Sequence, residues 1–348
     1  MKVLVTGATG NVGSAVVRRL ADNDAVTEVI AVARRPGGLD HPGVRHAAAD
    51  LARDDLRDHL ERVDALVHLA WDFLPQRRPV DTWSSNVVGS VRLFSAAIDA
   101  GVGAIVHASS VGAYSPRSDD LAVTESWPTH ALPTAAYGRE KSYLERVLDG
   151  IEVEHPQTRV VRLRSAFVFQ ESATHEQLRI FAGGPLARLL VGVQRLPVLP
   201  FPRSMRMQAV HADDLAAAYT AATIGDARGP FNIAAGGPLD ASAFAAAFGA
   251  RALPIPDGLA RSALAAGYAS RLVPTDPGLL ELALSLPVMD TTRASEQLGW
   301  RPLRTGREAL DALVAGLDAQ AAGATPALAD EGGPRPATPD AARAAASG

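Results

Sequence analysis

The alternation of short apolar runs with longer helical stretches constrains the fold of this chain more than any other feature. The apolar, β-branched runs have the length and composition of strands that are covered on both faces of a sheet, and they lie at residues 3–6, 29–33, 65–70, 104–109 and 159–164. Stretches with helical spacing lie between them, at residues 13–22, 86–100 and 135–148. This order predicts right-handed βαβ units and therefore an α/β fold with a doubly wound parallel sheet.

The pattern changes after about residue 165, where the chain becomes irregular and richer in Pro and Gly, as in LPVLPFP at 196–202. We therefore expect residues 1–165 to form the sheet domain, with later segments returning to it, and residues 166–318 to form mainly a smaller lobe. Residues 319–348 are mostly Ala, Gly and Pro with scattered charge. Such a composition cannot bury enough apolar surface to order itself, so we expect a disordered tail.

Composition excludes several classes of protein. The 348 residues are 47% hydrophobic, enough for a large core, and include no cysteine, which rules out disulfides and thiolate chemistry. The nine histidines show no metal-ligand spacing, so no metal is expected. The net charge of −4 without a basic block argues against nucleic acid. The sequence shows no signal peptide or membrane-spanning segment, so we expect a cytoplasmic protein that does not bind a membrane. We expect its partner to be a small-molecule substrate, and a homodimer is possible.

Residues 6–14, TGATGNVGS, place three glycines where the first predicted strand ends and the first helix begins. Glycines at such a junction suit a phosphate held on a helix N-terminus, because unpaired N–H groups and the helix dipole favour an anion there. The spacing is G-x-x-G-x-x-G, one residue longer than the usual dinucleotide motif. The alternative is an ordinary glycine-rich turn.

Two further positions bear on the cofactor. Asp50 follows the stretch VRHAAA, so it would accept a hydrogen bond from an adenine amino group or cap a helix beginning near Leu51. The second strand ends in Ala33-Arg34-Arg35, where an NAD site usually presents an acidic residue. Guanidinium groups suit a 2′-phosphate, which favours NADP and leaves NAD possible. A solvated basic turn is the alternative.

Tyr137 and Lys141 are four residues apart in a predicted helix and therefore share one face. A neighbouring ammonium lowers the pKa of a tyrosine, so the pair would exchange a proton with a hydroxyl or carbonyl. Ser109 and Ser110 lie at the end of the predicted strand at 104–109, at the edge where open parallel sheets bind ligands. The alternative is that Tyr137 and Lys141 are a chance pair in a helix and that the two serines only cap the end of a strand.

Together these motifs resemble the extended short-chain dehydrogenase/reductases, and more narrowly the NAD-dependent epimerase/dehydratase group. The likeness covers about residues 1–315 and also includes HLA at 68–70, NVVG from Asn86, SSVGAY, HADD at 211–214 and the late MDTTRASEQLGWRP. It implies a Rossmann fold with Ser110, Tyr137 and Lys141 as catalytic residues and Asn86 holding a proton-relay water. The cofactor site would be lined by Gly7, Thr9, Gly10, Asn11, Val12, Gly13, Arg34, Arg35, Asp50, Leu51, Leu69 and Ala70, with Tyr137 and Lys141.

Two departures from the resemblance concern the substrate. Nucleotide-sugar enzymes of this group usually have a Gly-Pro after an arginine, but Arg164 is followed by SAFVFQ. Met207 stands where their diphosphate-binding arginine lies, with Arg206 one residue earlier. We therefore predict an NAD(P)-dependent oxidoreductase for a smaller or more apolar carbonyl compound. The alternatives are a nucleotide-sugar epimerase or dehydratase that regenerates its cofactor, and a non-catalytic NAD(P)-sensing protein.

Overall fold

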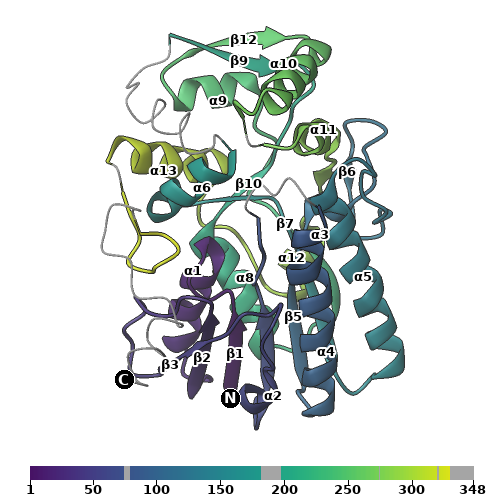
Figure 1. Cartoon of the computed structure of the whole chain (residues 1–348), viewed down its shortest axis with the longest axis vertical. Coiled ribbons are helices and arrows are strands. Elements are labelled where there is room, and N and C mark those ends of the chain that lie inside the picture. Colours follow the sequence, from purple (N-terminus) through teal and green to yellow (C-terminus); the bar gives the residue numbers. More distant parts are fainter. Residues whose placement is uncertain (74–78, 182–196, 274, 320, 330–348) are drawn as a thin grey trace.

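Seven parallel strands form the central sheet of the computed structural model, which describes residues 1–73, 79–181, 197–273, 275–319 and 321–329. The order across the sheet is β3, β2, β1, β4, β5, β7, β11 (Figure 1). These strands are β1 (Lys2–Thr6), β2 (Glu28–Ala33), β3 (Val44–Ala48), β4 (Ala65–His68), β5 (Ala104–Ser110), β7 (Arg159–Ser165) and β11 (Gly229–Ile233). Because all neighbours are parallel, the carboxyl ends of the strands meet at one edge.

Helices cover both faces of this sheet. Residues alternate between the faces along β1, so Val3 and Val5 pack in one apolar core and Leu4 in the other. The first core is closed by α1 (Asn11–Ala21), α8 (Ala212–Ile224) and α12 (Thr292–Gln297), and the second by α2 (Arg57–Leu60), α4 (Gly89–Asp99) and α5 (Ala136–Glu154). Helix α3 (Pro79–Trp83) leads through a π-helical turn, Ser84–Val88, into α4. Among the described helices, none combines the length and apolar character needed to cross a bilayer.

The predicted doubly wound α/β fold is confirmed. The runs at 3–6, 29–33, 104–109 and 159–164 are strands to within one residue at either end, and the run at 65–70 ends as a strand at His68. Strands β3 and β11 were not among the predicted runs. The helix expected near Leu51 is wrong, because that segment forms a turn and α2 begins at Arg57.

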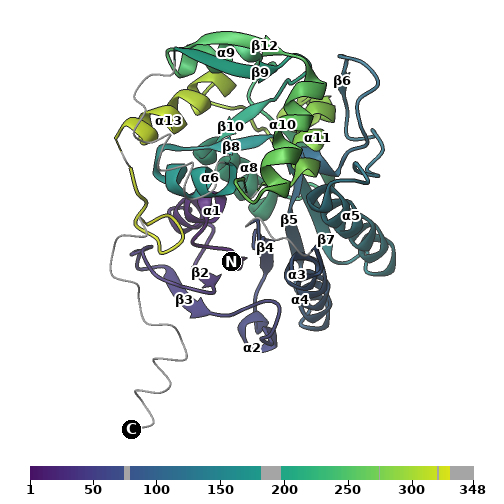
Figure 2. The ribbon, with the colours of Figure 1, turned by 45° about the horizontal axis from the view of Figure 1, so that its top comes forward.

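Short two-stranded parallel sheets lie beyond the carboxyl edge of the central sheet. They pair β8 (Phe167–Phe169) with β10 (Ala209–His211), β9 (Val198–Pro202) with β12 (Arg251–Ile255), and β6 (Ala122–Val123) with β13 (Val288–Met289). Around them lie α6 (Thr174–Phe181), α9 (Ala241–Ala247), α10 (Asp257–Ala269), α11 (Pro277–Ser285) and α13 (Gly306–Asp318) (Figures 1 and 2). We propose that this group, apart from β6, makes up the smaller lobe of residues 166–318, with α8, β11 and α12 counted in the sheet domain.

Residues 321–329 differ from the disordered tail that the composition predicts. Leu328 is 2% exposed, and the buried Thr325 hydroxyl donates to the Thr9 carbonyl at 2.7 Å. The segment also approaches Gly38, because a Cβ there would lie 2.2 Å from the Ala324 carbonyl oxygen. A few long-range contacts therefore order a segment that composition alone leaves without structure. The rest of the predicted tail, residues 330–348, lies outside the described residues.

Candidate active site

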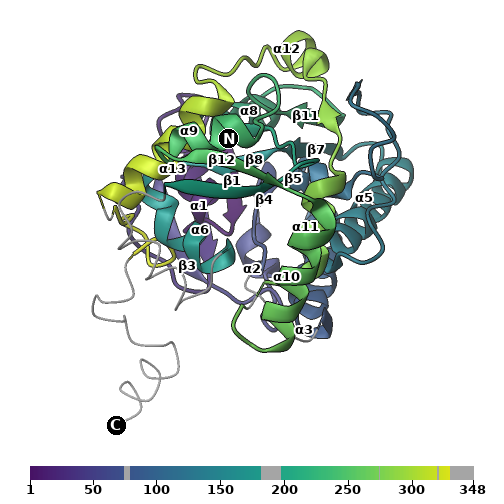
Figure 3. The ribbon, with the colours of Figure 1, turned by 90° about the horizontal axis from the view of Figure 1, so that it is seen from above.

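A cavity of about 730 Å³ opens at the carboxyl edge of the central sheet. Its lining includes Leu264 of α10, Leu279 of α11, Glu176 of α6 and Leu313 of α13. Seen from above, α10 and α11 lie across the molecule from α6 and α13 (Figure 3). The cavity brings together every residue that the sequence assigns to catalysis or to a cofactor: Gly7, Thr9, Gly10, Asn11, Val12, Gly13, Arg34, Arg35, Asp50, Leu51, Leu69, Ala70, Asn86, Ser110, Tyr137 and Lys141. Their individual roles stay predictions.

The glycine-rich loop joins β1 to α1 at the floor of this cavity. A Cβ on Gly13 would lie 2.0 Å from the Gly7 carbonyl oxygen, so close packing within the loop requires glycine there. Gly10 is different: it precedes α1 with φ −78°, and a Cβ would meet no described atom closer than 3.6 Å. Packing in the described chain therefore does not explain this glycine, whereas a phosphate against the N-terminus of α1 would.

Glu176 reaches this same helix N-terminus from α6. Its Oε2 accepts a hydrogen bond from the Asn11 backbone N–H at 3.1 Å. A carboxylate thus satisfies an N–H that an anionic ligand would also use. No local sequence pattern predicts this contact, because 165 residues separate the two partners.

Arg34, Arg35 and Asp50 follow β2 and β3 and line the cavity beside the loop. The Arg34 guanidinium is largely exposed and lies 3.8 Å from the Asp72 carboxylate. Asp50 caps the turn that replaces the expected helix, because its Oδ1 accepts from the Ala52 N–H at 3.0 Å. Two guanidinium groups and one carboxylate are therefore available at the ends of these strands.

Ser110 and Tyr137 both line the cavity. Ser110 is the last residue of β5, and its Oγ accepts from the Gly112 N–H at 3.0 Å. Tyr137 lies in the first turn of α5. Burial raises the pKa of Tyr137 to about 12, and the Ser110 side chain opposes this increase. The phenol is therefore protonated at neutral pH in the free protein.

Lys141 lies one helical turn beyond Tyr137 but contacts other groups. Its Nζ donates to the Ala108 carbonyl at 2.7 Å and lies 3.3 Å from the centroid of the Trp71 ring, a cation–π contact. Burial lowers the pKa of Lys141 well below its usual value. Because Nζ is 5.9 Å from the Tyr137 ring centroid, the expected lowering of the Tyr137 pKa by Lys141 is not found in the free protein.

Asn86, in the π-helical turn, joins two parts of the site. Its Oδ1 accepts from the Asp72 N–H at 2.7 Å, and its Nδ2 donates to the Asp72 carbonyl at 3.1 Å and to Glu140 at 2.8 Å. Glu140 is buried and also accepts from the Thr82 hydroxyl at 2.6 Å. Both side-chain amide hydrogens of Asn86 are therefore already donated. A relay water at Asn86 would have to donate its own hydrogen to an oxygen atom there. Sequence reasoning missed Glu140, although it directly precedes Lys141.

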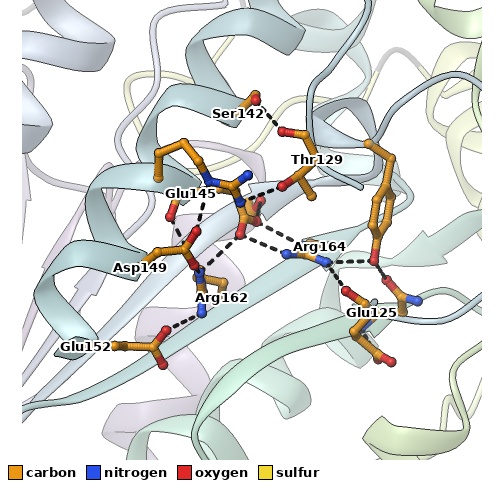
Figure 4. A network of polar contacts seen from close by, with 12 residues as sticks. Glu125, Thr129, Ser142, Glu145, Asp149, Glu152, Arg162 and Arg164 are labelled. Carbon is orange, nitrogen blue, oxygen red and sulfur yellow. Dashed lines mark hydrogen bonds and ion pairs between the residues drawn. The ribbon is translucent and has the colours of Figure 1, made fainter. Parts of the chain in front are cut away.

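A buried network of charges fixes α5 against β5 and β7 behind the cavity (Figure 4). Glu145 has no exposed surface and accepts from the Arg164 Nε and Nη2, each at 2.9 Å, and from the Ser109 hydroxyl at 2.5 Å. Arg162 lies 3.4 Å from the same carboxylate. Arg164 also donates to the Tyr114 hydroxyl at 2.9 Å. The network thus holds the strand end that carries Ser110.

Comparison with known proteins identifies the family. The model of the NAD dependent epimerase/dehydratase family matches residues 3–234. The chain is 31% identical over 163 residues to a UDP-glucose 4-epimerase of Azospirillum brasilense, which covers 44% of this chain and 45% of that protein. It is 36% identical over 149 residues to sterol demethylase protein B of Methylococcus capsulatus, 42% of this chain and 45% of that one. Each match thus spans a little under half of the curated relative.

A solved structure extends the comparison to most of the chain. UDP-glucose 4-epimerase of Thermus thermophilus in complex with NAD aligns with a TM-score of 0.67 at 21% identity. The alignment covers 91% of this chain and 99% of that one, which shows a shared fold. Together with the family model, which spans most of the described sheet domain and part of the lobe, this leads to one conclusion: the chain belongs to the NAD dependent epimerase/dehydratase family.

Proposed function

We propose that this protein is an NAD(P)-dependent oxidoreductase that interconverts a carbonyl and an alcohol, with Tyr137 as acid and base. The observation that carries the proposal is that Ser110, Tyr137 and Lys141 line one cavity that is continuous with the glycine-rich loop. Two hydroxyls at the carboxyl end of a central strand can hold one substrate oxygen next to a cofactor on the loop.

The chain's own groups have distinct parts in such a reaction. A nicotinamide, when bound, supplies or accepts the hydride. Ser110 donates a hydrogen bond that orients the substrate oxygen, and Tyr137 transfers a proton to or from that oxygen. The raised pKa keeps the phenol protonated, which suits proton donation during reduction. Lys141, one turn away, is a source of positive charge when the phenolate forms.

Several residues fit a dinucleotide. The absent Cβ of Gly10 leaves room against the N-terminus of α1, and Leu69 and Ala70 line the same side of the cavity. The Thermus thermophilus epimerase is complexed with NAD, which supports a nicotinamide cofactor here. Arg34 and Arg35 favour NADP over NAD, because a 2′-phosphate would lie among guanidinium groups at the end of β2.

Titration of both cofactors tests this preference. We expect NADP to bind about tenfold more tightly than NAD, since charge-assisted hydrogen bonds contribute about 1.5–3 kcal/mol before solvent screening. Replacing Arg34 and Arg35 together by Ala should remove the difference. Arg19→Ala, at an exposed arginine of α1 outside the cavity lining, is the control and should keep it. NAD bound as tightly as NADP, with no effect of the double replacement, would refute the preference.

Glu176→Gln should strengthen cofactor binding. The carboxylate bonded to the Asn11 N–H competes with the cofactor's phosphates for the N-terminus of α1. Removing its charge should lower the cofactor Kd about threefold, the size of one charge at a helix terminus. Glu171→Gln, at an exposed position just before α6, serves as the control. Equal or weaker binding of cofactor to Glu176→Gln, measured by calorimetry, would show that the carboxylate does not compete.

A reaction screen separates the proposed function from epimerisation. Sugar nucleotides and simple carbonyls are incubated with substoichiometric cofactor, and reduced-nicotinamide absorbance is followed together with product stereochemistry. Net redox chemistry stops when the cofactor is consumed. Many turnovers of an inverted sugar nucleotide per cofactor, without a net absorbance change, would favour an epimerase instead.

A further inference from the structure

We propose that the substrate is a neutral, largely apolar carbonyl compound or alcohol, held against the apolar side chains that the described part of the smaller lobe presents to the cavity. This inference rests on the proposed oxidoreductase function and adds the chemical class of its substrate. It is carried by the distribution of charge and apolar surface around the cavity.

The lobe presents an apolar wall to the cavity. The described lining residues between 198 and 286 include Met205, Met207, Phe244, Leu264, Leu279 and Leu282, and none of those lining residues carries a charge. Phe169, at the place of the missing Gly-Pro, is buried in the apolar cluster beneath this wall and lines the cavity as well. Such a wall gains free energy by removing apolar ligand surface from water.

Most of the charged lining residues that the structure describes lie on the cofactor side. Arg34, Arg35, Asp50 and Asp72 follow strands of the sheet and Lys141 lies on α5, whereas Glu176 comes from α6 of the lobe. The Arg34 and Asp72 side chains lie near each other, and Glu176 is bonded to the loop. A diphosphate or carboxylate placed against the described lining residues between 198 and 286 would therefore face uncharged, mostly apolar side chains and lose its hydration without compensation.

Two arginines near the lobe are paired with a carboxylate. Arg206, one residue before Met207, lies 3.2 Å from the Asp120 carboxylate, and Arg117 lies 3.0 Å from it. Neither arginine is among the described residues that line the cavity. Asp120 thus contacts both guanidinium groups away from the apolar wall.

Apolar surface also surrounds the reacting hydroxyl. The ring of Phe73 lies 4.8 Å from that of Tyr137, edge to face, and the ring of Trp71 lies 5.8 Å away. Leu282 packs in the same cluster as Tyr137. A substrate carbonyl that reaches Tyr137 would therefore carry its carbon skeleton against aromatic and aliphatic side chains.

Helix α10 offers a matched pair of variants. It has no buried residue, so a substitution on its surface leaves the core intact. Leu264 is half-buried and lines the cavity, whereas Leu259 is 58% exposed and does not. Replacing each by lysine adds the same charge to the same helix, inside the cavity in one case and outside it in the other.

Binding of Nile red, a neutral apolar dye, tests the substrate class without requiring turnover. We expect a stoichiometric complex with the cofactor-loaded protein, displaced by neutral ring ketones but not by UDP-glucose. Leu264→Lys should weaken dye binding at least about tenfold, because the ammonium must give up water in an apolar pocket. Leu259→Lys should bind the dye as the wild type does.

Three results would overturn the inference: no dye binding, equal binding by Leu264→Lys, or displacement by UDP-glucose at lower concentration than by any neutral ketone. The proposed function is judged by a different readout, oxidation of the reduced nicotinamide. Preferred turnover of a charged carbonyl compound with consumption of cofactor would refute the proposed substrate class and support the oxidoreductase function. Dye binding without any nicotinamide oxidation would support the substrate class and refute the oxidoreductase function.

Discussion

Tyr137→Phe is expected to lower kcat by about 10²–10⁴-fold, the range that a positioned general acid contributes. The variant keeps the aromatic ring that packs against Trp71 and Phe73 and loses only the hydroxyl. Because the proton is transferred in the chemical step, kcat and kcat/KM should fall together while the cofactor Kd changes little. Steady-state kinetics and a cofactor titration measure both.

Tyr143→Phe is the matched control for this prediction. Tyr143 lies on the same helix, six residues further on, and is 45% exposed. Its loss of a hydroxyl should leave turnover unchanged. Wild-type turnover by Tyr137→Phe, or an equal loss in both variants, would contradict the role given to Tyr137.

Glu145→Gln should destabilise the fold by about 3–5 kcal/mol, as expected when one partner of a buried ion pair is removed. The substitution leaves the buried guanidinium of Arg164 without its carboxylate and weakens the bond to Ser109 (Figure 4). Urea unfolding of the variant and the wild type gives the difference. Glu154→Gln, on an exposed position of the same helix, should change stability by less than about 0.5 kcal/mol.

The destabilisation should also depend on pH. Burial raises the pKa of Glu145, but the hydrogen bonds and charge of Arg164 outweigh it, so the pKa lies below the ordinary value of 4.5. A carboxyl with a depressed pKa stabilises the fold above its unfolded pKa and loses this contribution as the pH falls through its folded pKa. The gap between wild type and Glu145→Gln should therefore be full at pH 7 and shrink below about pH 4.5. A gap that is constant down to pH 3 would mean that the carboxylate's charge is not responsible.

The sequence predicted those features that repeat or lie close together along the chain. Strands such as β1 and β5 are short apolar runs with helical stretches between them, so they can be predicted without tertiary information. The site residues end these strands or begin these helices, and parallel order brings such positions to one edge. For that reason Gly10, Ser110 and Tyr137 were predicted together, and the structure places them around one cavity.

Contacts between segments that are far apart along the chain could not be predicted from the sequence. Glu176 reaches Asn11 across 165 residues, and Thr325 reaches Thr9 across 316. The pKa of Tyr137 was predicted in the wrong direction, because helical spacing puts Lys141 on the same face without fixing where its Nζ points. Burial and side-chain direction depend on tertiary packing, which a local pattern does not contain.

Deuterium transfer from labelled cofactor tests the central claim most directly. The reduced nicotinamide carries deuterium at its transferable position, and the wild-type protein is incubated with neutral ketones under single-turnover conditions. We predict one deuterium on the new carbinol carbon for each nicotinamide oxidised, and none with Tyr137→Phe on the same timescale. Retention of the label on a cofactor that is never consumed, in the presence of any ketone or sugar nucleotide that is converted, would contradict it.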